Sequence, residues 1–102
     1  MNTAEMKNEI QRIIDDNNEK KKLLSLFVEF CYGVADNEKS LMLLNECINK
    51  TNSVNKEFKT LIDQYNLGVD SPIETQYEFW KKVEKTWAEI DNWRIEQSKK
   101  YL

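Results

Sequence analysis

The chain has no histidine, only two glycines and one proline, and no long apolar run in its 102 residues. Without histidine, the commonest general base, the commonest metal ligand and the usual partner of a catalytic serine or cysteine are missing. The two glycines, Gly33 and Gly68, do not belong to a glycine-rich phosphate-binding pattern. We therefore expect no enzyme activity, no catalytic residue and no bound cofactor.

The two cysteines are Cys31 and Cys47, and their spacing is not the Cys-x-x-Cys spacing of a zinc site. Folding the chain about residues 36–37 would place Cys31 opposite Met42 and Cys47 opposite Leu26. The sulfurs would then be offset by about 8 Å along the helices, more than a disulfide spans. We predict that both thiols are reduced, buried core residues and that the chain has no metal site.

Charge and hydropathy exclude other classes of protein. The net charge of −3 comes from 15 basic and 18 acidic residues of interspersed sign, which argues against nucleic acid as a partner. No segment approaches the roughly 20 apolar residues that span a bilayer. The polar residues 1–10 do not resemble a secretory signal, so we expect a cytoplasmic protein without a membrane span.

The chain does have enough hydrophobic residues to form one core. Hydrophobic residues make up 40% of it, aromatic residues 11% and charged residues 32%, a globular composition. Its length suits a single helical domain covering residues 1–102. Because glycine and proline interrupt helices, their scarcity predicts long helices joined by few turns.

The clearest helix boundary lies at Ser71-Pro72. Ser71 is a good N-cap, Pro72 suits the first helical position, and Glu74 stands where it would close a capping box. Apolar residues then recur at three- and four-residue steps, which predicts a helix from Pro72 to about Lys100. Gly68 is expected to supply the left-handed conformation that ends the preceding helix.

The same rhythm predicts a second helix from about Glu38 to Tyr65, with Leu44, Cys47, Thr51, Val54, Phe58 and Leu61 on its apolar side. The first third is ambiguous. Asn2 or Thr3 can cap a helix, but the polar residues 15–18 either break it or form a polar turn inside one continuous helix.

The predicted fold is therefore all-α, an antiparallel bundle of three long helices with the first either continuous or broken near residues 15–18. If the second and third helices form a hairpin turning near Val69, four pairs face one another: Phe58 and Trp80, Leu61 and Tyr77, Thr51 and Trp87, and Ile48 and Ile90. Trp80 and Trp87 are then expected in the core.

Two regions carry more apolar surface than one helix contact needs. Residues 23–35 are apolar almost all round, with Leu26 and Phe30 on one side of the main stripe and Tyr32 on the other. In the last helix, Phe79, Ile90 and Trp93 form a second stripe beside that of Trp80 and Trp87. Both regions are either covered inside the bundle or left partly exposed for a partner, and these six residues are our candidate partner-binding residues.

Because the sequence has no catalytic or metal-binding pattern, the excess of apolar residues on two helices favours a function in protein–protein interaction. The leading hypothesis is a stoichiometric inhibitor, an immunity or anti-defence protein, or an adaptor that acts through the aromatic residues of a helix face on another protein. The alternative is a homo-oligomeric helical assembly component or a secretion partner. A third class, a small ligand between helices with Lys20, Lys21 or Arg94 meeting phosphate, has no specific support in the sequence.

Overall fold

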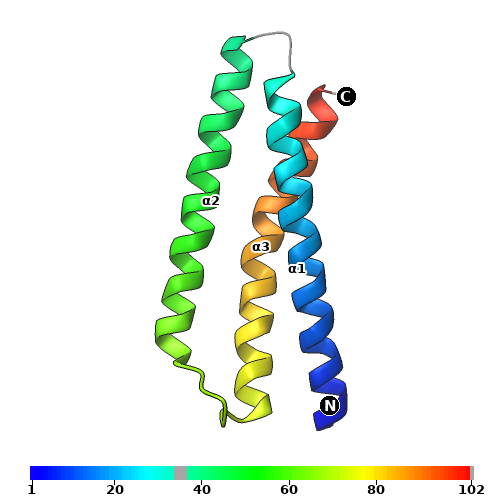
Figure 1. The fold of residues 1–102 in the computed structure, drawn as a ribbon, viewed down its shortest axis with the longest axis vertical. Coiled ribbons are helices and arrows are strands. Elements are labelled where there is room, and N and C mark those ends of the chain that lie inside the picture. Colours follow the sequence, from blue (N-terminus) through cyan, green and yellow to red (C-terminus); the bar gives the residue numbers. More distant parts are fainter. Residues whose placement is uncertain (34–36, 102) are drawn as a thin grey trace.

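The computed structural model describes residues 1–33 and 37–101 and contains three long helices: α1 (Thr3–Tyr32), α2 (Asn37–Tyr65) and α3 (Ile73–Tyr101) (Figure 1). The helices run up, down and up along a body measuring 51 × 24 × 17 Å. They pack against one another, and the described residues contain no strand. The predicted all-α bundle of three antiparallel helices is confirmed.

α1 is one continuous helix. The side chain of Asn2 caps it, accepting a hydrogen bond from a first-turn backbone N–H at 2.8 Å. The polar residues 15–18 do not break the helix, so the alternative of a continuous helix is the correct one. Two features keep these residues helical: Asp16 forms an ion pair with Lys20 one turn later, at 3.0 Å, and Asn17 points into the bundle.

The connection between α2 and α3 differs from the prediction in two details. Asn66, not Gly68, adopts the left-handed conformation after α2, with φ of 45°, because asparagine tolerates this region well. The Ser71 hydroxyl accepts a hydrogen bond from the backbone N–H of Gly68 at 2.7 Å instead of capping the first turn of α3. Helix α3 begins at Ile73, after Pro72, so the predicted Ser71 cap is wrong.

The core follows α3, which lies against both other helices. One cluster contains Phe27 and Cys31 from α1, Leu43, Cys47, Val54 and Leu61 from α2, and Phe79, Val83, Trp87, Ile90 and Trp93 from α3, and Ile10 and Ile13 of α1 are also buried. Both cysteines are free thiols in this core, as expected of small buried hydrophobic residues. Trp87 is buried as predicted, whereas Trp80 is only half-buried.

The contacts between α2 and α3 differ from the predicted register near the end of α2, whereas Phe58 and Trp80, one of the predicted pairs, line the same pocket. A pairing of Leu61 with Tyr77 would set Tyr65 against Ile73, but the Tyr65 hydroxyl donates to the carboxylate of Glu78 at 2.8 Å. Helix α3 therefore starts beyond the end of α2, and the connecting segment runs out to meet it (Figure 1). Ile48, predicted to face buried Ile90, is exposed.

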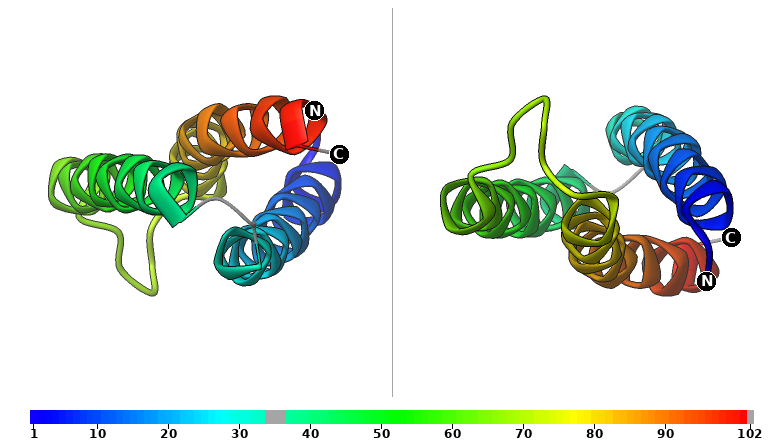
Figure 2. Two further views of the ribbon diagram at one scale, coloured as in Figure 1. Left: turned by 90° about the horizontal axis from the view of Figure 1, so that it is seen from above. Right: turned by 90° about the horizontal axis from the view of Figure 1, so that it is seen from below.

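The three helices do not form a regular triangle along their whole length. At the end where α1 begins, α3 lies between α2 and α1, whereas at the opposite end α1 and α2 approach each other (Figure 2). The contact between α1 and α2 is accordingly the smallest of the three helix interfaces, and that between α1 and α3 the largest. Parts of α1 and α2 that would cover each other in a regular bundle are left without a helical neighbour.

Candidate interaction surface

The candidate residues on α3 are core residues. Phe79 is 5% exposed and Trp93 is 9% exposed, and Ile90 is also buried. The Phe79 ring lies 6.1 Å from that of Phe58 on α2, centroid to centroid, and Trp93 meets Phe27 on α1. Of the two alternatives for this stripe, coverage inside the bundle is the correct one, because α3 lies against both other helices.

The candidates on α1 do not form one patch. Leu26 and Tyr32 are exposed, but they are six residues apart, which places them on different faces of the helix. Phe30 is half-buried and its ring packs 6.2 Å from that of Phe27. The apolar segment is thus partly covered and partly exposed over residues 23–33, and its last two residues, Val34 and Ala35, lie outside the described residues.

An apolar stripe on α2, which we name the α2 flank, is exposed at some positions and packed against the core at others, where Leu44, Phe58 and Tyr65 are partly buried. Its residues recur in steps of three and four: Leu41, Leu44, Ile48, Thr51, Asn55, Phe58, Ile62 and Tyr65. None is charged, and Leu41, Ile48 and Ile62 are exposed. This flank lies directly beside the stripe of Leu43, Cys47, Val54 and Leu61 that contacts the core, so α2 has two adjacent apolar seams.

Sequence reasoning missed this flank because it merged the two seams into one. The predicted apolar side of the helix took Cys47, Val54 and Leu61 from the core seam and Thr51 and Phe58 from the flank. The distinguishing signal was present in the sequence. The flank keeps the three-four spacing through the whole helix, whereas the core seam has Lys50 and Glu57 at its intermediate positions, so the two stripes can be told apart.

A small pocket lies between the three helices near the middle of α1, and we name it the Asn17 pocket. Its lining residues are Ile14, Asn17, Asn18 and Lys21 from α1, Phe58 from α2, and Trp80, Val83 and Trp87 from α3. Asn17 is only 3% exposed, and neither polar atom of its side-chain amide has a hydrogen-bond partner in the described part of the chain. The Lys21 ammonium lies 5.2 Å from the centre of the Trp87 ring, in a cation–π contact.

The size of the pocket limits what it can hold. Its volume of about 60 Å³ is far below the several hundred that sites for small-molecule ligands and cofactors occupy. It is sufficient for a water molecule or for one polar side chain. Because an unsatisfied buried amide costs about 1 to 3 kcal/mol per polar group, a partner for Asn17 in this pocket would be favourable.

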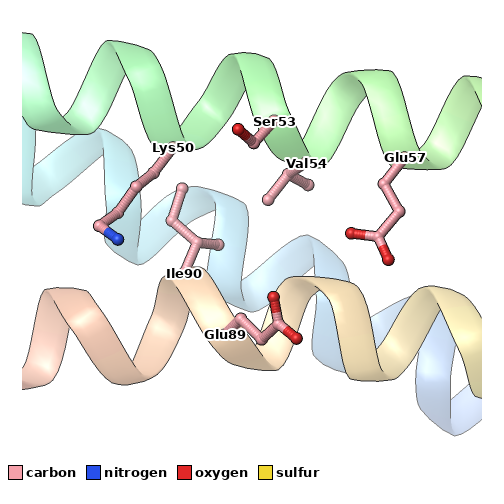
Figure 3. Close-up of a pocket in the computed structure, with 6 residues that line it drawn as sticks. All are labelled: Lys50, Ser53, Val54, Glu57, Glu89 and Ile90. Carbon is pink, nitrogen blue, oxygen red and sulfur yellow. The ribbon is translucent and has the colours of Figure 1, made fainter.

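The opposite side of α2 has a different character. Figure 3 shows a hollow of about 160 Å³ between α2 and α3, with Val54 and Ile90 at its centre and Lys50, Ser53, Glu57 and Glu89 around it. Charged side chains of both signs surround this hollow, as on an ordinary solvated surface. The two sides of α2 are therefore distinct, one charged and the other uncharged and apolar.

Within residues 1–33 and 37–101, no group of three or more cysteine, aspartate or glutamate side chains is arranged to hold a metal ion. None of the helices in this part of the chain has the length and hydropathy that crossing a membrane requires.

Fold and surface together define a small antiparallel three-helix bundle with a partly exposed apolar stripe on its second helix. No protein-family model matches the sequence, and no curated protein or solved structure matches the chain.

Proposed function

We propose that this protein is a non-enzymatic protein-binding module that acts through the α2 flank, as a stoichiometric inhibitor, an immunity or anti-defence protein, or an adaptor. The supporting observation is the row of exposed Leu41, Ile48 and Ile62 beside half-buried Phe58. Apolar residues scattered singly over a surface need no explanation, but exposed apolar residues that share one face of a helix favour an interaction site. Partner proteins commonly lay a helix along such a row.

Two neighbouring residues provide a matched test. Leu41 and Met42 are consecutive on α2 and similarly exposed, at 62% and 66%, but only Leu41 belongs to the α2 flank. A Leu41→Glu substitution should abolish capture of the partner from the cell that produces the protein, while Met42→Glu should leave capture unchanged. Circular dichroism of both variants checks that the bundle remains folded. If the two variants capture the same proteins as the natural chain, the proposal fails.

The alternative function, a homo-oligomeric assembly component, uses the same surface with a second copy as the partner. An uncharged helix face can pack against its own copy about a two-fold axis. Light scattering of the purified protein separates the two functions, because a heterologous binder can be a monomer. A dimer that Leu41→Glu dissociates and Met42→Glu does not would favour the oligomeric function.

A further inference from the structure

The helix face of α1 that borders the Asn17 pocket carries more positive than negative charge: Lys7 and Lys21 lie on it, and exposed Glu29 lies near its C-terminal end, one turn after Ser25. Ile14, Asn18 and Lys21 line the pocket, and residues at seven-residue intervals from them share their face of α1. We name this set the α1 wall: Ala4, Lys7, Gln11, Ile14, Asn18, Lys21, Ser25, Val28 and Tyr32.

The α1 wall and the α2 flank meet at the pocket, because Phe58 of the flank is also one of its lining residues. The residues named in the two sets include two lysines and no carboxylate, and Glu29 is the one carboxylate that lies among those of the α1 wall, although the chain as a whole has more acidic than basic residues. Neither Lys7 nor Lys21 has a carboxylate partner among the described residues. The local charge is thus opposite in sign to the net charge of the protein.

The unpaired amide of Asn17 adds a requirement for hydrogen bonding. A carboxamide presents a donor and an acceptor side by side, and a second carboxamide satisfies both in one planar pair. Asn17 also occupies a seam position on α1, in step with Ile10 and Ile13. In paired helices, a single asparagine at such a position fixes the register of the partner helix at a cost in stability.

We propose that the α1 wall and the α2 flank bind an acidic amphipathic helix of another protein, whose asparagine or glutamine side chain enters the Asn17 pocket. This inference rests on the proposed function and names the partner class. The apolar face of the partner helix covers Leu41, Ile48 and Ile62, its carboxylates lie near Lys7 and Lys21, and its carboxamide pairs with that of Asn17. The volume of the pocket fits one such side chain and excludes a nucleotide or a larger cofactor.

The test uses a displayed library of amphipathic helices about three heptads long with a leucine seam. The positions flanking the seam and one central seam position are randomised. Selection uses the full natural chain, with the folded Leu41→Glu variant as the counter-selection. We expect the selected helices to be enriched in aspartate and glutamate beside the seam and in asparagine or glutamine at the central position.

Three variants then test whether the selected helices recognise the lysine charges and the amide of Asn17. A Lys7→Glu, Lys21→Glu double variant should bind them at least about tenfold more weakly, since like charges then oppose each other. The matched Lys56→Glu, Lys99→Glu double variant changes the net charge by the same amount, but at exposed sites outside this surface, and should bind the helices normally. In Asn17→Leu, the preference for asparagine or glutamine over leucine at the central position should disappear.

Several results would overturn this inference while leaving the proposed function intact. Selection of basic helices, selection without charge preference, or no selection at all would show that the partner is not an acidic helix. A preference for a central carboxamide that survives Asn17→Leu would remove the pocket from the recognition and leave it as the site of a water molecule. A dimer of the protein that Leu41→Glu dissociates would show that a second copy occupies the surface. Failure of the proposed function is a different result, namely unchanged capture by Leu41→Glu.

Discussion

The edge of one aromatic ring meets the face of another where Phe27 of α1 packs against Trp93 of α3, with ring centroids 5.5 Å apart and planes at 80°. This is a preferred geometry for aromatic pairs and adds to the free energy gained by burial. The Lys50 ammonium covers Trp93 from the α2 side, 5.7 Å from the ring centre. Trp93 therefore joins all three helices.

Substituting Trp93 should lower the stability of the bundle, and its effect should not be limited to partner binding. We expect Trp93→Ala to lower the free energy of unfolding by about 3 to 5 kcal/mol, as removal of large buried aromatic residues does. Thermal and denaturant melts measure this change. Exposed Tyr32 provides the control, because Tyr32→Ala should change stability by less than about 0.5 kcal/mol. Equal stability of Trp93→Ala and the natural chain would contradict the packing described above.

Replacing Asn17 by leucine should stabilise the protein. The substitution removes a buried amide without hydrogen-bond partners and adds apolar volume beside a small pocket, so we expect a gain of about 1 to 3 kcal/mol. Denaturant unfolding of Asn17→Leu against the natural chain measures it. The neighbouring Asn18→Leu, at an exposed position, should have little effect. A clear loss of stability in Asn17→Leu would mean that the amide has a favourable partner, such as a bound water.

The ion pairs of Glu84 predict a pH dependence of stability. Burial acts to raise the pKa of Glu84, but the hydrogen bond from Arg12 at 2.7 Å and the charges of Lys81 and Arg12 hold this pKa below its ordinary value. A lowered pKa in the folded state means that the contribution to stability is present at neutral pH and is lost as the pH falls through the lowered pKa.

We therefore expect Glu84→Gln to lower the melting temperature slightly at pH 7, because the pair is near the surface. The difference from the natural chain should shrink as the pH falls or as salt is added. The matched control is Glu96→Gln, at an exposed position on the same helix and away from its first turn, and it should show no such dependence. A difference that stays constant down to strongly acidic pH would exclude this ion pair as its cause.

The two thiols should resist modification in the folded protein. Burial raises the pKa of Cys31, and the nearby Cys47 adds to the effect. Burial also raises the pKa of Cys47, against a smaller opposing hydrogen bond with Thr51. The thiolate is the reactive form of cysteine. At neutral pH, a disulfide reagent should therefore react with the two thiols only as fast as the chain unfolds. In denaturant, the same reagent should react with both thiols at once. Rapid reaction of either thiol under native conditions would contradict their burial.

The sequence by itself determined the helices, because helix formation depends on local preferences. The scarcity of glycine and proline and the three-four spacing of apolar residues predicted three helices close to those observed. Asn2 was correctly predicted as a possible cap of α1 for the same reason: capping involves only the first turn. Local rules were not sufficient at Ser71, whose hydroxyl bonds to Gly68 instead.

The tertiary structure alone decided which faces are covered. The predicted register assumed a tight turn at Val69, whereas the segment after Tyr65 runs past the end of α2, so Tyr65 meets Glu78. That difference, together with the position of α3 between the other helices, buries Phe79 and Trp93 and leaves Leu41 and Ile48 exposed. Two adjacent stripes on α2 carry apolar residues, and only the packing of three helices selects which one forms the core.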